Sequence, residues 1–278
     1  MPGDKTTVNS NGVSLDVEVQ GSGAAVLLIH GFPDTKRPWS KQTPALLDAG
    51  YQVITYDQRG YGASDKPEAV DAYSIVFLAM DATAVLDAVG VQKAHVVGHD
   101  WGAAVAWAAA SFAPDRVDHL VALSVGHPSS FGTAGFAQRE KSWYMLLFQF
   151  HPQAEQWLTM NGWANAREWS KHPDLDAVIA DLERDGSLTP ALNYYRANVN
   201  ADALVGPPLE LPAIQSPTMG VWSSGDFALT EQQMTGSAAF CASGFRYERV
   251  EGPGHWLQWE APDEVNGLLL DFLPRQTG

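Results

Sequence analysis

The most informative short segment of the sequence is residues 98–102 (GHDWG), in which two glycines flank a carboxylate with the spacing G-x-D-x-G. An apolar run precedes this segment and an alanine-rich run follows it, which predicts a sharp turn from a strand into a helix. Such turns carry a serine nucleophile in the G-x-S-x-G pattern, and their glycines allow close approach of neighbouring backbones. Asp100 is therefore the first candidate for a catalytic nucleophile.

A carboxylate at this turn predicts a different reaction from a serine. Attack of a carboxylate on a carbonyl carbon would give an anhydride, whereas attack on a saturated carbon gives an alkyl ester that water can hydrolyse. Epoxides and alkyl halides offer saturated carbons with a strained ring or a good leaving group. The alternative is that Asp100 only caps the following helix, since aspartate is a favourable N-cap residue.

His255 and Asp226 are candidates for the other members of a catalytic triad. His255 lies in the glycine-rich segment 252–256 (GPGHW), where it could reach the turn and act as a base on water. Asp226 follows another predicted strand and could fix the tautomer of His255 by accepting its other ring N–H. The chain order nucleophile, acid, histidine is typical of this turn architecture. The alternative for Asp226 is an ordinary turn aspartate.

The seven other histidines lack the context of His255. His119, His151 and His172 are expected to be solvent-exposed or packing residues, and His95 lies at the start of a predicted strand. His30 and His99 flank the proposed site and are expected to orient its loops.

Residues 30–33 (HGFP) follow the first long apolar strand and form a candidate oxyanion hole. The backbone N–H of Phe32, together with that of Trp101, could stabilise the intermediate that forms when water attacks an Asp100 ester. The alternative is a plain turn after the strand. The predicted substrate pocket consists of His30, Pro33, Trp101 and Trp256.

The elements that must position these residues alternate along the chain. Apolar or β-branched runs bounded by Gly, Pro or Asp predict buried strands. They occupy residues 24–29, 51–56, 94–97, 119–125, 218–222 and 245–250. Helices are predicted between Ser74 and Gly90, over 101–112 and over 262–272. The alternation predicts an α/β fold with a mostly parallel central sheet flanked by helices.

Residues 128–212 differ from the rest of the chain, because they contain no clear strand and many aromatic residues at helix-compatible spacing. We predict that they form an inserted helical cap (lid) domain, with residues 1–127 and 213–278 as the core domain. The alternative is that they are peripheral helices of one larger α/β domain. Either arrangement places them over the carboxyl edge of the sheet.

Composition excludes several classes of protein. The 278 residues include 17 Lys and Arg against 32 Asp and Glu, and the net charge of −15 disfavours nucleic-acid or anionic-membrane partners. A single cysteine, Cys241, excludes an internal disulfide or a thiolate metal cluster. No apolar run approaches the roughly 18 residues of a membrane span, and no signal-peptide segment is evident. These features predict a cytoplasmic protein, and they leave both a monomer and a homodimer open.

The motifs together resemble the α/β-hydrolase superfamily, and within it the epoxide hydrolase branch. The resemblance extends from about residue 21 to residue 273. It rests on 30–39 (HGFPDTKRPW), 56–67 (YDQRGYGASDKP), 97–102 (VGHDWG), 142–149 (SWYMLLFQ), 192–198 (LNYYRAN) and 252–256 (GPGHW). It implies an α/β-hydrolase fold with an inserted helical cap.

The resemblance also implies two cap tyrosines, Tyr144 and Tyr195, that hydrogen-bond the epoxide oxygen and donate a proton as the ring opens. Such groups suit an alkoxide leaving group. Tyr194 could instead be the inward-facing residue, since consecutive helix residues face different sides. Aromatic packing within the cap is the alternative role for Tyr144 and Tyr195.

The implied reaction adds water to a small apolar or aryl epoxide and gives a vicinal diol, with no metal or organic cofactor. Asp100 would form the ester, and His255 would activate the water that hydrolyses it. Haloalkane or haloacid dehalogenation at Asp100 is an alternative, although Phe32 and Trp101 stand where those families typically carry asparagine and arginine. A non-catalytic small-molecule receptor on the same fold is a third, but it need not keep the full triad.

Overall fold

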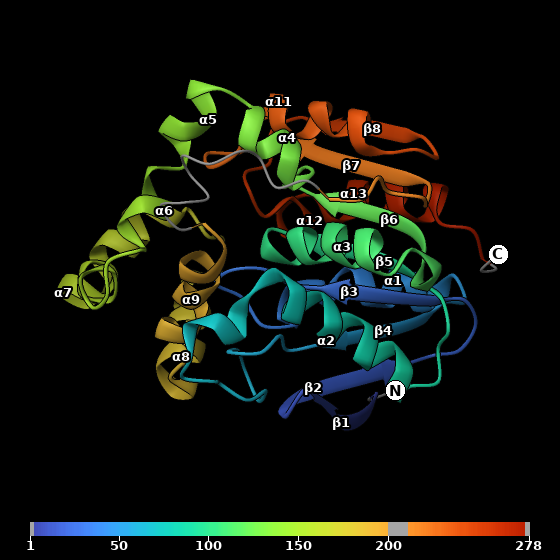
Figure 1. Cartoon of the computed structure of the whole chain (residues 1–278), viewed down its shortest axis with the longest axis horizontal. Helices are drawn as coiled ribbons and strands as arrows, with labels where there is room; N and C mark the ends of the chain where they lie inside the picture. Colours follow the sequence, from blue (N-terminus) through green and yellow to red (C-terminus); the bar gives the residue numbers. More distant parts are fainter. Residues whose placement is uncertain (1–2, 200–210, 276–278) are drawn as a thin grey trace.

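The computed structural model describes residues 3–199 and 211–275, and the sheet at its centre has eight strands within those residues (Figure 1). The strand order is β1-β2-β4-β3-β5-β6-β7-β8. The bounds are β1 (Asp4–Ser10), β2 (Val13–Gln20), β3 (Ala25–Ile29), β4 (Gln52–Tyr56), β5 (Ala94–His99), β6 (Val117–Leu123), β7 (Thr218–Ser223) and β8 (Phe245–Val250). Strands β3 to β8 run parallel, whereas β1 and β2 are antiparallel to their neighbours. The predicted mostly parallel sheet is confirmed.

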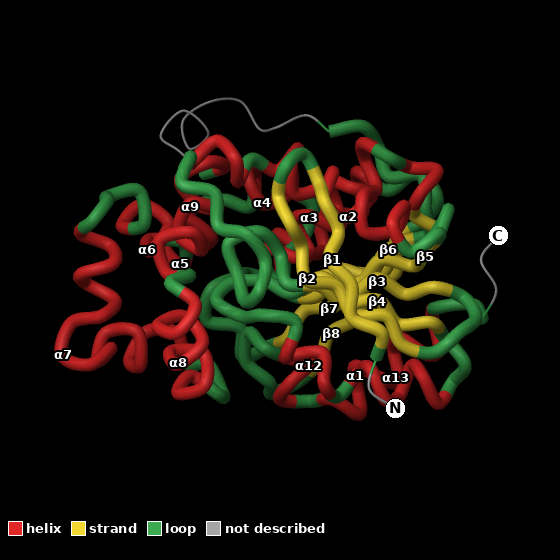
Figure 2. Tube along the Cα trace, turned by 90° about the horizontal axis from the view of Figure 1, so that it is seen from below, coloured by secondary structure: helices red, strands yellow, loops and turns green. Residues whose placement is uncertain are grey.

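The central strands are apolar on both faces because helices cover both faces of the sheet (Figure 2). In β3, Leu27 and Ile29 belong to the apolar cluster on the side of α2 and α3, whereas Val26 and Leu28 belong to the cluster on the side of α1 and α13. A strand buried on both faces has a continuous apolar sequence, and this is why β3 could be predicted from the sequence. Strands β1 and β2 were missed because β1 lies at the sheet edge with mostly exposed residues and β2 alternates buried and half-buried ones.

The helices around the sheet are α1 (Gln42–Asp48), α2 (Ile75–Ala88), α3 (Trp101–Phe112), α11 (Glu231–Thr235), α12 (Leu257–Glu260) and α13 (Pro262–Phe272), with short 3-10 helices η1 (Arg37–Ser40), η2 (Val70–Tyr73), η3 (Pro114–Arg116) and η4 (Gly236–Phe240). Three of them, α2, α3 and α13, follow their predicted ranges closely, whereas the other helices there were not predicted. Ser74 occupies the N-cap position of α2 but makes no capping bond through its side chain. The Asn198 side chain instead accepts the Ile75 N–H at 2.7 Å, so a distant segment supplies the cap.

The chain between β6 and β7 consists of helices and connecting loops, has no strand among its described residues apart from an isolated bridge at Ile214, and its helices α5 to α9 lie beyond the carboxyl ends of the strands (Figure 1). Its helices are α4 (Pro128–Thr133), α5 (Phe136–Lys141), α6 (Trp143–Leu147), α7 (Gln153–Ser170), α8 (Leu175–Asp185) and α9 (Leu188–Asn198). Helix α7 is interrupted by non-helical backbone at residues 160–163. Part of the predicted cap, residues 200–210, falls outside the described residues, and the division into core and cap stays a prediction.

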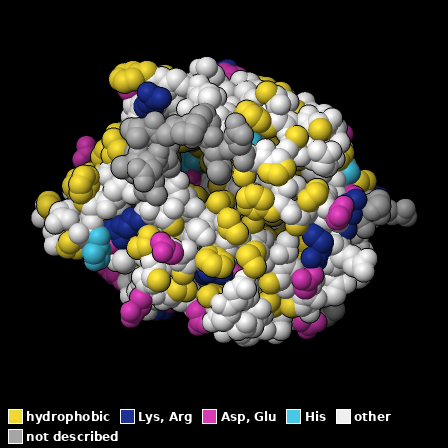
Figure 3. Space-filling model, in the orientation of Figure 1, with side chains coloured by type: hydrophobic (Ala, Val, Ile, Leu, Met, Phe, Trp, Pro, Cys, Tyr) yellow, Lys and Arg dark blue, Asp and Glu magenta, His cyan; other side chains and the backbone are white. Residues whose placement is uncertain are grey.

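No helix among the described residues is long and apolar enough to cross a membrane. On the face seen in Figure 3, apolar side chains gather over the middle, and acidic and basic groups lie mainly toward the edges.

Candidate active site

Asp100 lies in the turn between β5 and α3 with a backbone φ of 53°, a region that residues other than glycine seldom occupy. The two glycines are required by close backbone contacts. A Cβ atom on Gly98 would collide with the carbonyl oxygen of Gly102, and one on Gly102 would collide with that of Ile29. The turn therefore holds Asp100 at the carboxyl edge of the sheet in a conformation that the surrounding structure imposes.

The carboxylate of Asp100 faces two partners across the cleft. The Phe32 backbone N–H donates a hydrogen bond of 2.7 Å to Asp100 Oδ1, and His255 Nε2 lies 3.4 Å from Oδ2. Although Asp100 occupies the N-cap position of α3, its side chain makes no capping hydrogen bond. The alternative that Asp100 only caps the helix is therefore wrong.

The structure brings together Asp100, His255 and Asp226, which come from the ends of β5, β8 and β7. His255 Nδ1 lies 2.9 Å from Asp226 Oδ2, so this nitrogen donates and Nε2 faces Asp100. Asp226 Oδ1 accepts the backbone N–H groups of Ala228 and Leu229 at 2.8 and 2.9 Å. All three side chains are largely shielded from water, which strengthens the interactions among them.

The protonation of His255 depends on its two acidic neighbours. Burial disfavours the charged imidazole, but the negative charges of Asp226 and Asp100 outweigh it and raise the pKa of His255 to about 10. At neutral pH the ring is therefore an imidazolium that forms ion pairs with both carboxylates. Loss of the charge on Asp100 would lower the pKa of His255.

The neighbouring His99 is neutral, in contrast to His255. Burial lowers its pKa to about 4, and its Nε2 lies 2.9 Å from the carbonyl oxygen of His255. Neutral His99 therefore donates a hydrogen bond to the backbone of the catalytic candidate, as expected for a residue that orients a loop of the site.

A small cavity lies between Asp100, His255 and the helices beyond the sheet. Its volume is about 20 Å³, room for about one water molecule. Its lining residues are Phe32, Pro33, Asp100, Tyr144, Trp169, Ser170, Tyr195, Phe227, Ala228, His255 and Trp256. Sequence reasoning missed Trp169, Ser170, Phe227 and Ala228, although Phe227 directly follows Asp226.

The two tyrosines implied by the family resemblance both line this cavity, and their ring centroids are 5.9 Å apart. Burial, followed by the negative charge of Asp100, raises the pKa of both hydroxyls, so they are neutral donors. Tyr194 faces elsewhere, because its hydroxyl donates to the carbonyl oxygen of Arg59 at 2.7 Å. The structure thus answers which of the two adjacent tyrosines points toward Asp100.

Two residues of the predicted substrate pocket do not line the cavity, whereas Pro33 and Trp256 do. His30 is buried, with Nε2 accepting the Gln58 N–H and Nδ1 donating to the Gly31 carbonyl, so it orients the loop instead. Trp101 packs edge-on against Tyr195, with centroids 5.2 Å apart, and therefore contacts a residue of the cavity wall without lining the cavity itself.

His172 was expected to be a solvent or packing residue, but it also makes specific hydrogen bonds. Its Nδ1 accepts the Asp174 N–H, so Nε2 carries the proton and donates to Asp34 at 3.2 Å. Asp34 also accepts the indole N–H of Trp256 at 3.0 Å. This buried network joins the loop after α7 to the loop after β3 and holds Trp256 next to His255. No local sequence signal identified it.

The chain is similar to known proteins over nearly its whole length. Residues 24–262 match the model of the alpha/beta hydrolase fold family. The chain is 34% identical to Epoxide hydrolase A of Mycobacterium tuberculosis, over 96% of each protein, and 34% identical to an epoxide hydrolase of Caballeronia sordidicola, over 96% of this chain and 92% of that protein. Among solved structures, epoxide hydrolase A from Mycobacterium thermoresistibile superposes with a TM-score of 0.79 at 31% identity, covering 98% of both chains.

Proposed function

The chain belongs to the α/β-hydrolase family and to its epoxide hydrolase branch, and we propose that it adds water to an epoxide through an ester on Asp100. It is a hydrolase that acts on the ether bond of an epoxide. The observation that carries the proposed mechanism is the arrangement around the cavity. A carboxylate held by a strained turn, a histidine beside it and two tyrosine hydroxyls share one small space.

In the first step the epoxide oxygen binds between the hydroxyls of Tyr144 and Tyr195. Asp100 attacks one ring carbon from the opposite side, a C–O bond of the ring breaks, and the leaving oxygen takes a proton from a tyrosine. The alkyl ester of Asp100 carries no charge, so the pKa of His255 falls. The imidazolium then returns a proton to the tyrosinate and becomes a neutral base.

In the second step neutral His255, oriented by Asp226, takes a proton from water, and the hydroxide attacks the carbonyl carbon of the ester. The N–H groups of Phe32 and Trp101 stabilise the oxyanion that forms. Collapse releases the diol and regenerates the Asp100 carboxylate, with the proton of the new carboxyl group passing to the departing alkoxide. His255 ends the cycle as the imidazolium with which it began, so every proton is accounted for.

The substrate is an apolar or aryl epoxide in this proposal, because the cavity walls include Trp169, Phe227 and Trp256. The cavity volume of about 20 Å³ is too small for such a substrate, so side chains or the helices beyond the sheet must move to admit it. We also propose that residues 128–212 act as a cap that carries the two tyrosines, over a core of residues 1–127 and 213–278. Neither a metal ion nor an organic cofactor takes part in these steps.

Labelled water tests the ester route directly. In a single turnover of styrene oxide with excess enzyme in H₂¹⁸O, we expect unlabelled 1-phenylethane-1,2-diol and one ¹⁸O atom in the side chain of Asp100. The reason is that water attacks the ester carbonyl, and the oxygen that leaves with the diol came from Asp100. Mass spectrometry of the diol and of the peptide measures both. Label in the first-turnover diol would show direct attack of water on the epoxide and contradict the proposal.

Replacing Tyr144 or Tyr195 with phenylalanine is expected to slow formation of the ester, by about 10²-fold or more when both hydroxyls are removed, because ring opening loses its proton donor. Stopped-flow or quenched-flow measurement of the first turnover separates this step from hydrolysis of the ester. Tyr194→Phe is the matched control. Tyr194 lies beside Tyr195 on α9, but its hydroxyl donates to the carbonyl oxygen of Arg59. Equal slowing by Tyr194→Phe would mean that the effect is structural.

A further inference from the structure

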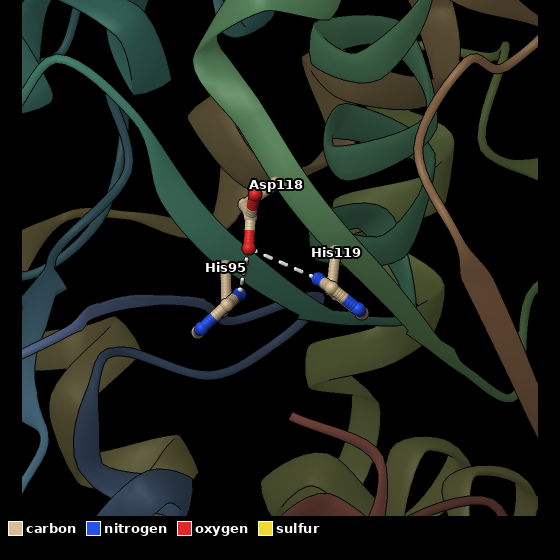
Figure 4. A group of neighbouring side chains, drawn as sticks. All are labelled: His95, Asp118 and His119. Atoms are coloured by element: carbon tan, nitrogen blue, oxygen red, sulfur yellow. Dashed lines mark hydrogen bonds and ion pairs between the residues drawn. The ribbon is translucent and has the colours of Figure 1, made fainter. Parts of the chain in front are cut away.

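A second group of chemically capable side chains lies at the amino ends of β5 and β6, at the opposite end of β5 from Asp100. In Figure 4 the carboxylate of Asp118 lies between the rings of His95 and His119. Asp118 Oδ2 is 3.3 Å from His95 Nδ1 and 3.0 Å from His119 Nδ1. All three atoms lie within 4.8 Å of one another, so a single ion could contact them together.

The position of the proton on His95 makes this group unusual. His95 Nε2 lies 2.8 Å from the carbonyl oxygen of Pro274, which can only accept, so Nε2 carries the proton. In the neutral ring with its proton on Nε2, Nδ1 carries a lone pair. That lone pair is fully buried, has no hydrogen-bond donor among the residues that the structure describes, and faces a carboxylate oxygen. Asp118 is bonded by His119 and Lys93, but the buried His95 lone pair faces an acceptor, and a cation beside Asp118 Oδ2 would satisfy it.

We propose that His95, Asp118 and His119 bind a divalent transition metal ion, with Zn²⁺ as the best match, at a site separate from the catalytic centre. Two imidazole nitrogens and one carboxylate oxygen are ligands that Zn²⁺ prefers. Tetrahedral Zn²⁺ sets its ligand atoms roughly 3.3 Å apart, close to the separations around Asp118 Oδ2. His119 is partly exposed, which leaves room for water as a fourth ligand.

The surroundings of the three ligands resemble the supporting shell of a metal site. The Pro274 carbonyl holds Nε2 of His95, as a backbone carbonyl commonly does for a metal-binding histidine. Lys93 Nζ lies 3.2 Å from Asp118 Oδ1, which orients the carboxylate and leaves Oδ2 toward the histidines. The Lys93 charge also opposes a cation, so the affinity should be moderate.

Binding of the ion replaces the hydrogen bond between His119 Nδ1 and Asp118 Oδ2, and neutral His119 then carries its ring proton on Nε2 and offers the Nδ1 lone pair to the ion. The bound ion would join β5 and β6 directly and would tie both, through His95, to the carbonyl of Pro274 that follows α13. We therefore infer a structural role for the metal in holding the end of the chain against the sheet.

Calorimetric titration of the tag-free, chelator-treated protein with ZnCl₂ tests the site. We expect one equivalent to bind wild type, and His119→Gln to weaken the affinity by about 100-fold or more, since one of three protein ligands is lost. Cobalt(II) should give the intense visible absorption of a tetrahedral ion with wild type and lose it with His119→Gln. The thermal midpoint of wild type should rise with Zn²⁺ concentration, because only the folded chain holds the ligands together.

Two further variants serve as comparisons in the titration. His151→Gln removes an exposed histidine that pairs with Glu155, and it should bind Zn²⁺ as wild type does. Lys93→Gln removes the opposing charge and should tighten binding several-fold while leaving all three ligands in place. The absence of detectable binding at 1 mM ZnCl₂ would overturn the proposal, because a Kd of 1 mM corresponds to a binding free energy of only about −4 kcal/mol. So would unchanged binding in His119→Gln, which would place the ion elsewhere, for instance at the catalytic triad.

Discussion

Mixing the His255→Gln variant with styrene oxide is expected to leave the mass of one whole epoxide bound to the peptide that contains Asp100. The nucleophile and both cavity tyrosines remain in this variant, so the ester can form. Glutamine cannot accept a proton from water, so hydrolysis of the ester stops and steady-state turnover falls by about 10³-fold or more. Intact-protein mass spectrometry followed by peptide mapping measures the adduct and its position.

The same variant also distinguishes the two reactions open to an aspartate nucleophile. An alkyl adduct from 1-bromobutane alone, with release of bromide, would assign the chain to dehalogenation instead. His151→Gln is the control, because it removes an exposed histidine and should neither accumulate an adduct nor lose turnover. Full steady-state activity of His255→Gln would contradict the role of this histidine as the base.

Replacing Asp100 with asparagine is expected to reduce turnover by about 10⁴-fold or more, the scale seen when an enzyme loses its nucleophile. The amide has nearly the same shape and can still accept the Phe32 N–H through Oδ1, so the fold should be retained. Steady-state assays with styrene oxide, together with the absence of any adduct in the His255→Gln background, measure the effect. Asp115→Asn, which changes an exposed acid just after α3, should leave turnover unchanged.

Asp100→Asn should also change the titration of His255 without any substrate present. The Asp100 charge is one of the causes that raise the pKa of His255 to about 10, so its removal should lower that pKa. A raised folded-state pKa stabilises the protein below the ordinary value of 6.5, and this contribution is lost as the pH rises through 10. In the variant the loss should therefore occur at lower pH. NMR titration of the imidazole measures the pKa, and an unchanged value would contradict the coupling that the mechanism requires.

Much of the fold and of the triad could be predicted because the signals are local. A strand covered on both faces is buried at every position, as β3 and β5 are, and is therefore mostly apolar, and the turn at Asp100 needs glycines at fixed spacing. Once parallel strands are recognised, residues that follow their carboxyl ends must meet at one edge. This topological rule alone, without any knowledge of contacts, predicted that Asp226 and His255 lie close to Asp100.

The strands β1 and β2 at one edge of the sheet were not predicted from the sequence. Strand β1 exposes most of its side chains, so its sequence lacks the apolar run by which the inner strands were recognised. Its position depends on pairing with β2, which in turn pairs with β4 from a later part of the chain.

The α/β architecture, the sharp turn at Asp100 and the chain order of the triad follow from the sequence alone, because each depends on residue type and short spacing. The packed structure was needed to show which of two adjacent tyrosines faces Asp100, that His172 bonds to Asp34, and that His95 faces the carboxylate of Asp118. These outcomes depend on the rotation of a helix about its axis and on the register between strands. Packing against distant parts of the chain sets both, and no local pattern of residues encodes them.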